Sequence, residues 1–132
     1  MKSHKIIGNF ALTAGILLAL SSLMHFFSGY PAINEMIARD NPSAETALAF
    51  RVIWVFASIT MCLTGIWGIF ISKGLKTGQK NAWWQGLALG LGMLFFCLAA
   101  QFIEFPNYGM LLFGVIGLLL VVPLLLGKRS FQ

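Results

Sequence analysis

Long apolar runs alternate with polar segments along the chain, and the single charged residue within the runs is Arg51, at the start of the second. Each run has about 20 residues, which is enough for a helix to cross a hydrocarbon core of about 30 Å. A transmembrane β-barrel would instead need segments of about ten residues with alternating polarity. The sequence therefore predicts an all-α fold, a four-helix transmembrane bundle in a single integral membrane domain over residues 1–132. The predicted spans lie at about 6–27, 50–72, 82–103 and 109–127.

The longest polar segment, residues 28–49, separates the first two spans. Part of this segment carries apolar residues at helical spacing, with polar residues between them. The spacing predicts a short amphipathic helix that lies on the membrane surface in this loop. The apolar residues that set the spacing are Ile33, Met36 and Ile37.

Composition and charge add an orientation to this picture. The chain is 58% hydrophobic and 10% charged, whereas soluble domains carry about 25% charged residues. Seven of the nine basic residues, and none of the four acids, fall in the three segments that four spans would place on one side. These segments are the N-terminal residues, the loop at 73–81 and the C-terminal residues. The positive-inside rule then predicts a multi-pass protein of the cell (inner or plasma) membrane with both termini cytoplasmic and the first loop external.

The sequence does not indicate several other classes of chemistry. The basic residues are scattered over the termini and one turn, which does not favour nucleic-acid binding. Cys62 and Cys97 form no C-x-x-C motif and are expected to be buried apolar residues. His25 alone offers too few donors for a four-ligand metal site, and no Gly-rich phosphate loop occurs. We therefore expect no metal and no cofactor.

Small and polar residues share one face in three of the predicted spans. Helical steps of three and four connect small residues at depth to polar residues near the outer end of each span. Small residues let helices approach closely in lipid, so a bundle would bring these faces together. The polar residues at the outer ends are His25, Arg51, Gln101 and Glu104, with Trp54 and Tyr30 near the rim.

Two interpretations of this polar cluster remain open. Charged residues near the bilayer usually face the bundle interior and pair with one another. In the first interpretation, Arg51 forms an interfacial salt bridge with Glu104 or Glu45, and His25 caps the first span. In the second, the cluster of His25, Arg51, Gln101 and Glu104 lines a pocket that opens outward and binds an anionic headgroup or another small polar or lipophilic ligand.

The main functional hypothesis is a non-enzymatic ligand-binding or accessory component. Such a protein would contact membrane lipids and pack against a copy of itself or a membrane partner. The second hypothesis leaves enzymatic activity open: a small membrane enzyme acting on a lipid or lipophilic substrate at the outer leaflet. There His25 would act as acid and base with Glu104 as its counterpart, and Arg51 would hold an anionic group. A transporter or channel subunit is the third hypothesis. The inner halves of the spans are mostly apolar, however, and threonines and glycines are the main exceptions.

Overall fold

The structure, a computed structural model, describes residues 2–103 and 105–131. Within these residues almost the whole chain is helical and no strand forms. Four helical segments in the described part are long and apolar enough to cross a membrane. The prediction of an all-helical, multi-pass membrane protein is confirmed at this level. The elements are α1 (Lys2–Phe27), α2 (Gly29–Asp40), α3 (Ala44–Lys76), α4 (Lys80–Ile103), the 3-10 helix η1 (Tyr108–Met110), α5 (Leu111–Leu126) and the 3-10 helix η2 (Lys128–Phe131).

The helices extend beyond the apolar runs at the end where the first loop lies. Helix α3 has 33 residues, which corresponds to about 50 Å. It begins after Ser43, whose hydroxyl accepts a hydrogen bond of 3.2 Å from the amide of Thr46, a typical N-cap arrangement. Helix α2 follows α1 after Ser28 alone and ends at Asn41, which adopts a left-handed conformation with φ 46°. The segment between the first two spans is therefore mostly helical.

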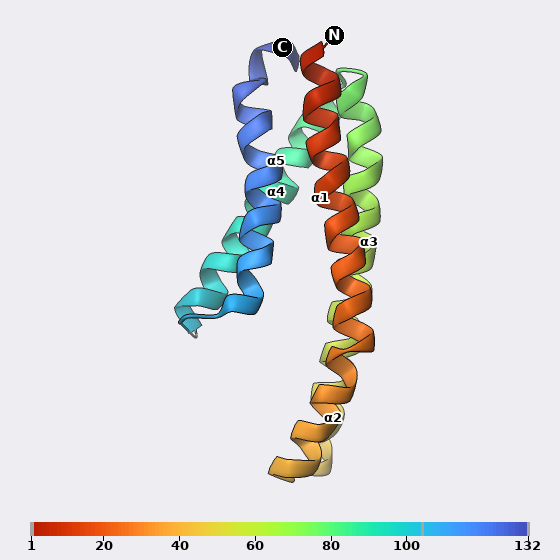
Figure 1. The fold of residues 1–132 in the computed structure, drawn as a ribbon, viewed down its shortest axis with the longest axis vertical. Coiled ribbons are helices and arrows are strands. Elements are labelled where there is room, and N and C mark those ends of the chain that lie inside the picture. The colour runs from red at the N-terminus through yellow and green to blue at the C-terminus, as the bar shows by residue number, and fades with distance from the viewer. Residues whose placement is uncertain (1, 104, 132) are drawn as a thin grey trace.

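The four spans form two antiparallel hairpins of unequal length (Figure 1). Helices α1 and α3 lie side by side, and α2 continues beyond α1 and contacts the start of α3. Helices α4 and α5 form the shorter hairpin. The two hairpins meet near the end that holds the N- and C-termini and diverge toward the other end (Figure 1). We call the end that holds the termini the joined end, and the opposite end the far end.

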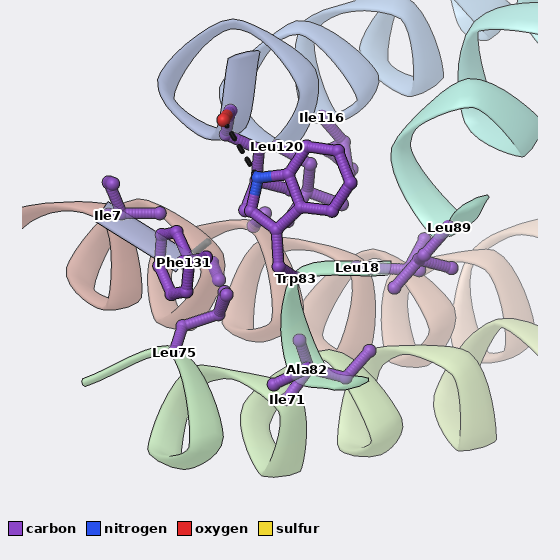
Figure 2. Packing of buried hydrophobic residues seen from close by; sticks show 13 residues of the cluster. Ile7, Leu18, Ile71, Leu75, Ala82, Trp83, Leu89, Ile116, Leu120 and Phe131 are labelled. Carbon is purple, nitrogen blue, oxygen red and sulfur yellow. Dashed lines mark hydrogen bonds between the residues drawn. The ribbon is translucent and has the colours of Figure 1, made fainter. Parts of the chain in front are cut away.

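The buried core lies where the two hairpins meet. Trp83 on α4 is 5% exposed, and its indole Nε1 donates a hydrogen bond of 2.9 Å to the carbonyl oxygen of Leu124 on α5. Figure 2 shows this indole among aliphatic side chains from several helices. Satisfying the N–H allows a large aromatic group to be buried without an unpaired donor. The core comprises Ile7, Ala11, Ala14, Leu18, Ile71, Leu75, Ala82, Trp83, Leu89, Ile116, Leu120, Leu124 and Phe131.

Glycines bring the helices of each hairpin into close contact, as their spacing in the sequence predicts. A Cβ atom added at Gly15 would lie 2.8 Å from the carbonyl oxygen of Gly65, and one at Gly65 would lie 2.6 Å from the amide nitrogen of Ala19. On the other hairpin, a Cβ at Gly117 would lie 2.9 Å from the carbonyl oxygen of Gly90. These contacts leave no room for a side chain, which is how small residues permit backbone approach in membrane helices.

Charge is divided between the two ends of the molecule. The joined end holds the start of α1, the turn between α3 and α4, and η2. The described basic side chains there are Lys5, Lys73, Lys76, Lys80, Lys128 and Arg129. The far end holds α2 and the start of α3, with the acids Glu35, Asp40 and Glu45 and the basic residues Arg39 and Arg51.

Candidate functional site

His25, near the end of α1, forms a compact cluster with two residues of α3. Its ring stacks on Trp54, with the ring centroids 4.0 Å apart and the planes inclined by 9°. The Trp54 Nε1 donates a hydrogen bond of 2.9 Å to the backbone oxygen of His25. The His25 Nδ1 lies 2.8 Å from Ser58 Oγ. The cluster therefore connects α1 to α3 through both stacking and hydrogen bonds.

The hydrogen bonds of Ser58 indicate which ring nitrogen of His25 carries the proton. Ser58 Oγ donates its single hydrogen to the backbone oxygen of Trp54 at 2.9 Å. Because a hydroxyl has one hydrogen to donate, Ser58 accepts from His25, and the Nδ1 of His25 is the donor. In the neutral ring, Nε2 is then the nitrogen with the free lone pair. The Ser58 hydroxyl is engaged with a carbonyl and is not activated as a nucleophile by this histidine.

Arg51 belongs to a second polar group, nearer the far end. Its Nε donates a hydrogen bond of 2.9 Å to Asn34 Oδ1 on α2. Asn34 in turn donates from Nδ2 to the backbone oxygen of Tyr30 at 3.1 Å. The contact fixes the Nε of an exposed guanidinium, and no acidic side chain among the described residues pairs with it. Its terminal nitrogens remain oriented donors for a ligand.

A cavity of about 450 Å³ adjoins Arg51 on the surface of the long hairpin. Arg51 and Tyr30 are the two residues with polar side chains among those that line it, and apolar residues of α3 lie on both sides of Arg51. These apolar residues extend along α3 for several turns toward the middle of the span. They are Leu48, Val52, Val55, Phe56 and Ile59.

Gln101 lies on the other hairpin and stabilises the turn that connects α4 to α5. Its Nε2 donates to the backbone oxygen of Asn107 at 2.6 Å, and its Oε1 accepts from the amide of Asn107 at 2.9 Å. The structure therefore does not bring Gln101 to His25 or Arg51. Glu104, the expected partner of Arg51, lies outside the described residues. Glu45, the alternative partner, is exposed on α3 and forms no ion pair in the described structure.

The polar faces of the spans pack against different neighbours, which explains why Gln101 is separated from His25 and Arg51. The face of α1 that carries Gly15, Ser22 and His25 packs against α3, and Ser58 lies on the matching face of α3. The corresponding face of α4 instead packs against α5, where a Cβ at Gly114 would lie 3.0 Å from Cys97 Sγ. Two of the three polar faces meet, and the third belongs to a separate contact.

Two residues of these groups were not among the candidates from the sequence. Ser58 lies seven residues after Arg51, on the same face of the second span, so helical spacing could have indicated it. Asn34 carried no such signal, because it lies in the segment between the first two spans and its partner Arg51 is on the next helix. Gly29 also belongs to this contact, because a Cβ there would lie 2.8 Å from Trp54 Cε2. A glycine at this position lets the start of α2 pack on the indole.

The remaining polar groups at the far end are exposed. Arg39 and Asp40 at the end of α2 form an ion pair of 2.6 Å. The hydrogen bond from Arg39 lowers the pKa of Asp40 below its usual range. Such an exposed pair contributes little to stability, since solvent and salt screen it. In residues 2–103 and 105–131, no three His, Cys, Asp or Glu side chains are grouped to hold a metal ion.

An apolar groove of about 680 Å³ lies between α1 and α5 near the joined end. Ile6, Phe10, Leu118 and Val122 contribute to its walls, and Ser3 adds a hydroxyl at its rim. The groove offers contact area to acyl chains and few polar groups that could orient a reacting substrate.

No protein-family model, curated protein or solved structure matches the chain. The function therefore has to be argued from the residues and their geometry.

Proposed function

We propose that the chain is a non-enzymatic protein of the cell membrane that binds an amphiphilic ligand with an anionic group at Arg51. The observation that carries this proposal is the cavity beside Arg51, whose lining is apolar apart from Arg51 and Tyr30. An amphiphile likewise combines a charged head with an apolar tail. Arginine suits the head because its planar fork binds carboxylate or phosphate oxygens in pairs.

The proposed orientation places both termini in the cytoplasm and the Arg51 cavity near the external face. The division of charge between the joined end and the far end supports it, because basic residues concentrate on the cytoplasmic side of membrane proteins. In this orientation α2 lies outside, with Ile37 buried against its neighbours and Glu35 and Arg39 exposed. That distribution is compatible with an amphipathic helix at the outer surface.

Oleate and methyl oleate test the charge requirement, because they share an acyl chain and differ in the anionic group. We expect oleate to raise the melting temperature of the purified full chain in a non-ionic detergent, and methyl oleate to have a much smaller effect. Replacing Arg51 by Gln should weaken oleate binding about tenfold, the amount expected from losing one charge-assisted contact. The apparent affinity follows from the melting temperature as a function of oleate concentration.

Arg39→Gln is the matched control, since it removes the same charge from the same end without touching the cavity. This variant should retain the oleate response. Equal responses to the ester and the acid, or equal losses in the Arg39 and Arg51 variants, would refute the proposal.

We also propose that the chain associates with a second copy or a membrane partner. Gly92 on α4 has no neighbouring atom that an added Cβ would meet, and Ala88, one turn earlier on α4, is exposed. Small residues on an uncovered helix face are the type that pack in lipid. Crosslinking in native membranes should give a dimer or a mixed complex, and recovery of the monomer alone would contradict this association.

No specific observation favours the enzyme or the transporter. His25 is engaged with Ser58 and Trp54 and lines none of the cavities described above. These two functions remain predictions from the sequence.

A further inference from the structure

A small cavity at the joined end is lined by two lysines and three aromatic side chains. It has a volume of about 110 Å³, and its lining residues come from the first turn of α4 and from η2. This site is far from Arg51 along the long hairpin, at the opposite end of the molecule (Figure 1). The lining residues are Lys80, Trp83, Trp84, Lys128 and Phe131.

The position of η2, which carries Lys128, is set by contacts around the C-terminal residues. Phe131 is 5% exposed within the core, and the His4 ring lies 4.7 Å from the Phe131 ring between centroids. The Nε2 of His4 donates a hydrogen bond of 2.8 Å to the backbone oxygen of Ser130. These contacts connect η2 to the start of α1. They position Lys128 at the cavity that Lys80 also lines.

The other wall of the cavity is equally well fixed. The Trp83 indole is buried and bonded to Leu124, and it meets the Trp84 ring edge to face at 4.6 Å between centroids. Trp84 itself is 56% exposed. An exposed tryptophan beside lysines at the end of a membrane span is typical of the interface with lipid headgroups.

The charges around this cavity favour the binding of an anion. Two lysines line the same small space, and the first turn of α4 adds the partial positive charge of a helix N-terminus. The described acids lie at the far end, so none of them neutralises these lysines. Like charges held around one cavity repel each other unless a counterion lies between them.

We propose that this cavity binds the phosphate group of an anionic phospholipid from the leaflet at the joined end. The ammonium groups of Lys80 and Lys128 contact the phosphate oxygens, and Trp84 lies at the level of the headgroup. The acyl chains extend along the apolar surface of α5, where Leu125 and Leu126 are exposed. This site is independent of the ligand proposed at Arg51.

Native mass spectrometry of the full chain, released from nanodiscs with phosphatidylglycerol and phosphatidylcholine in equal amounts, tests the proposal. We expect one phosphatidylglycerol molecule to remain bound in preference to phosphatidylcholine. The variant with Lys80→Gln and Lys128→Gln should retain it with about 100-fold lower apparent affinity, about tenfold for each charge-assisted contact with the phosphate that is lost. The variant with Lys80→Arg and Lys128→Arg keeps both charges and should restore retention.

The matched control replaces Lys5 and Arg129 by Gln. It removes two charges from the same end, and neither residue lines the cavity. Retention should change less than twofold in this control and in Arg51→Gln. Equal losses of lipid retention in this control and in the variant with Lys80→Gln and Lys128→Gln would show diffuse attraction and overturn the site.

A second arm distinguishes a lipid from a free phosphate. Inorganic phosphate, added to protein from which lipid has been removed, should raise the melting temperature much less than phosphatidylglycerol does. An equal rise with inorganic phosphate, abolished by the Lys80 and Lys128 double variant, would overturn the lipid as the ligand. Circular dichroism of each variant verifies that the helices are intact.

Discussion

The hairpin of α1 and α3 and the hairpin of α4 and α5 use similar contacts in different places. In the long hairpin, glycines pack near the middle and the His25–Ser58 hydrogen bond lies toward the far end. In the short hairpin, Gly90 and Gly117 pack near the middle, and hydrogen bonds close both ends, at Gln101 in the turn and at Trp83 in the core. Each hairpin is thus held together internally, whereas the core at the joined end connects one to the other. The comparison suggests that each hairpin is a separate unit of local stability.

The largest expected effect comes from filling the glycine contact of the long hairpin. Gly65→Leu forces atoms into a space where even a Cβ lies 2.6 Å from the backbone of Ala19. Overpacking against a backbone should lower the free energy of unfolding by about 3 kcal/mol. Hydrogen exchange measured by mass spectrometry should show loss of protection in α1 and α3 with α4 and α5 still protected.

Gly92→Leu is the control for this substitution, because an added Cβ at Gly92 meets no atom within 4 Å. It should leave the unfolding free energy of the monomer nearly unchanged. Simultaneous loss of protection in both hairpins of the Gly65 variant would show that they unfold as one unit.

An intermediate effect is expected at the buried indole that connects α4 to α5 within the short hairpin. Trp83→Phe removes the indole N–H and leaves the carbonyl of Leu124 without its donor. Losing a buried hydrogen bond in this way costs about 1–3 kcal/mol, which a denaturant titration in detergent would measure. Trp84→Phe, on an exposed neighbour, should cost less than about 0.5 kcal/mol. Comparable losses in the two variants would contradict a special role for Trp83.

The smallest effect is expected at the polar cluster of the long hairpin. Ser58→Ala removes the acceptor of the His25 Nδ1 proton and should cost about 1 kcal/mol. Ser21→Ala is the matched control, since the Ser21 hydroxyl bonds only within its own helix, to Leu17 at 2.7 Å. Hydrogen exchange should increase near Trp54 in the first variant and not in the second. Identical exchange in both variants would mean that the cluster does not hold α1 to α3.

The apolar runs sufficed to predict the helices, and the small residues on each helix indicated faces suited to close packing. Helical periodicity shows which residues share a face, as with Gly15, Ser22 and His25, but it does not show which neighbour that face meets. The face that carries Gln101 looks the same in sequence, yet it packs against α5. Asn34 could not be found because its bond to Arg51 depends on how α2 follows α1. Ligand binding by these residues stays a prediction.

The unequal hairpins bear on the thickness of the surrounding bilayer. The apolar run of α1 is about 33 Å long, whereas the span that ends at Leu126 has 19 residues and reaches about 28 Å. The short hairpin is also inclined to α1 and α3 (Figure 1), which reduces its extent along their direction. Lipids match the apolar length of the helices beside them at a modest cost per ångström. A bilayer that matches α5 would therefore be about 5 Å thinner than one that matches α1.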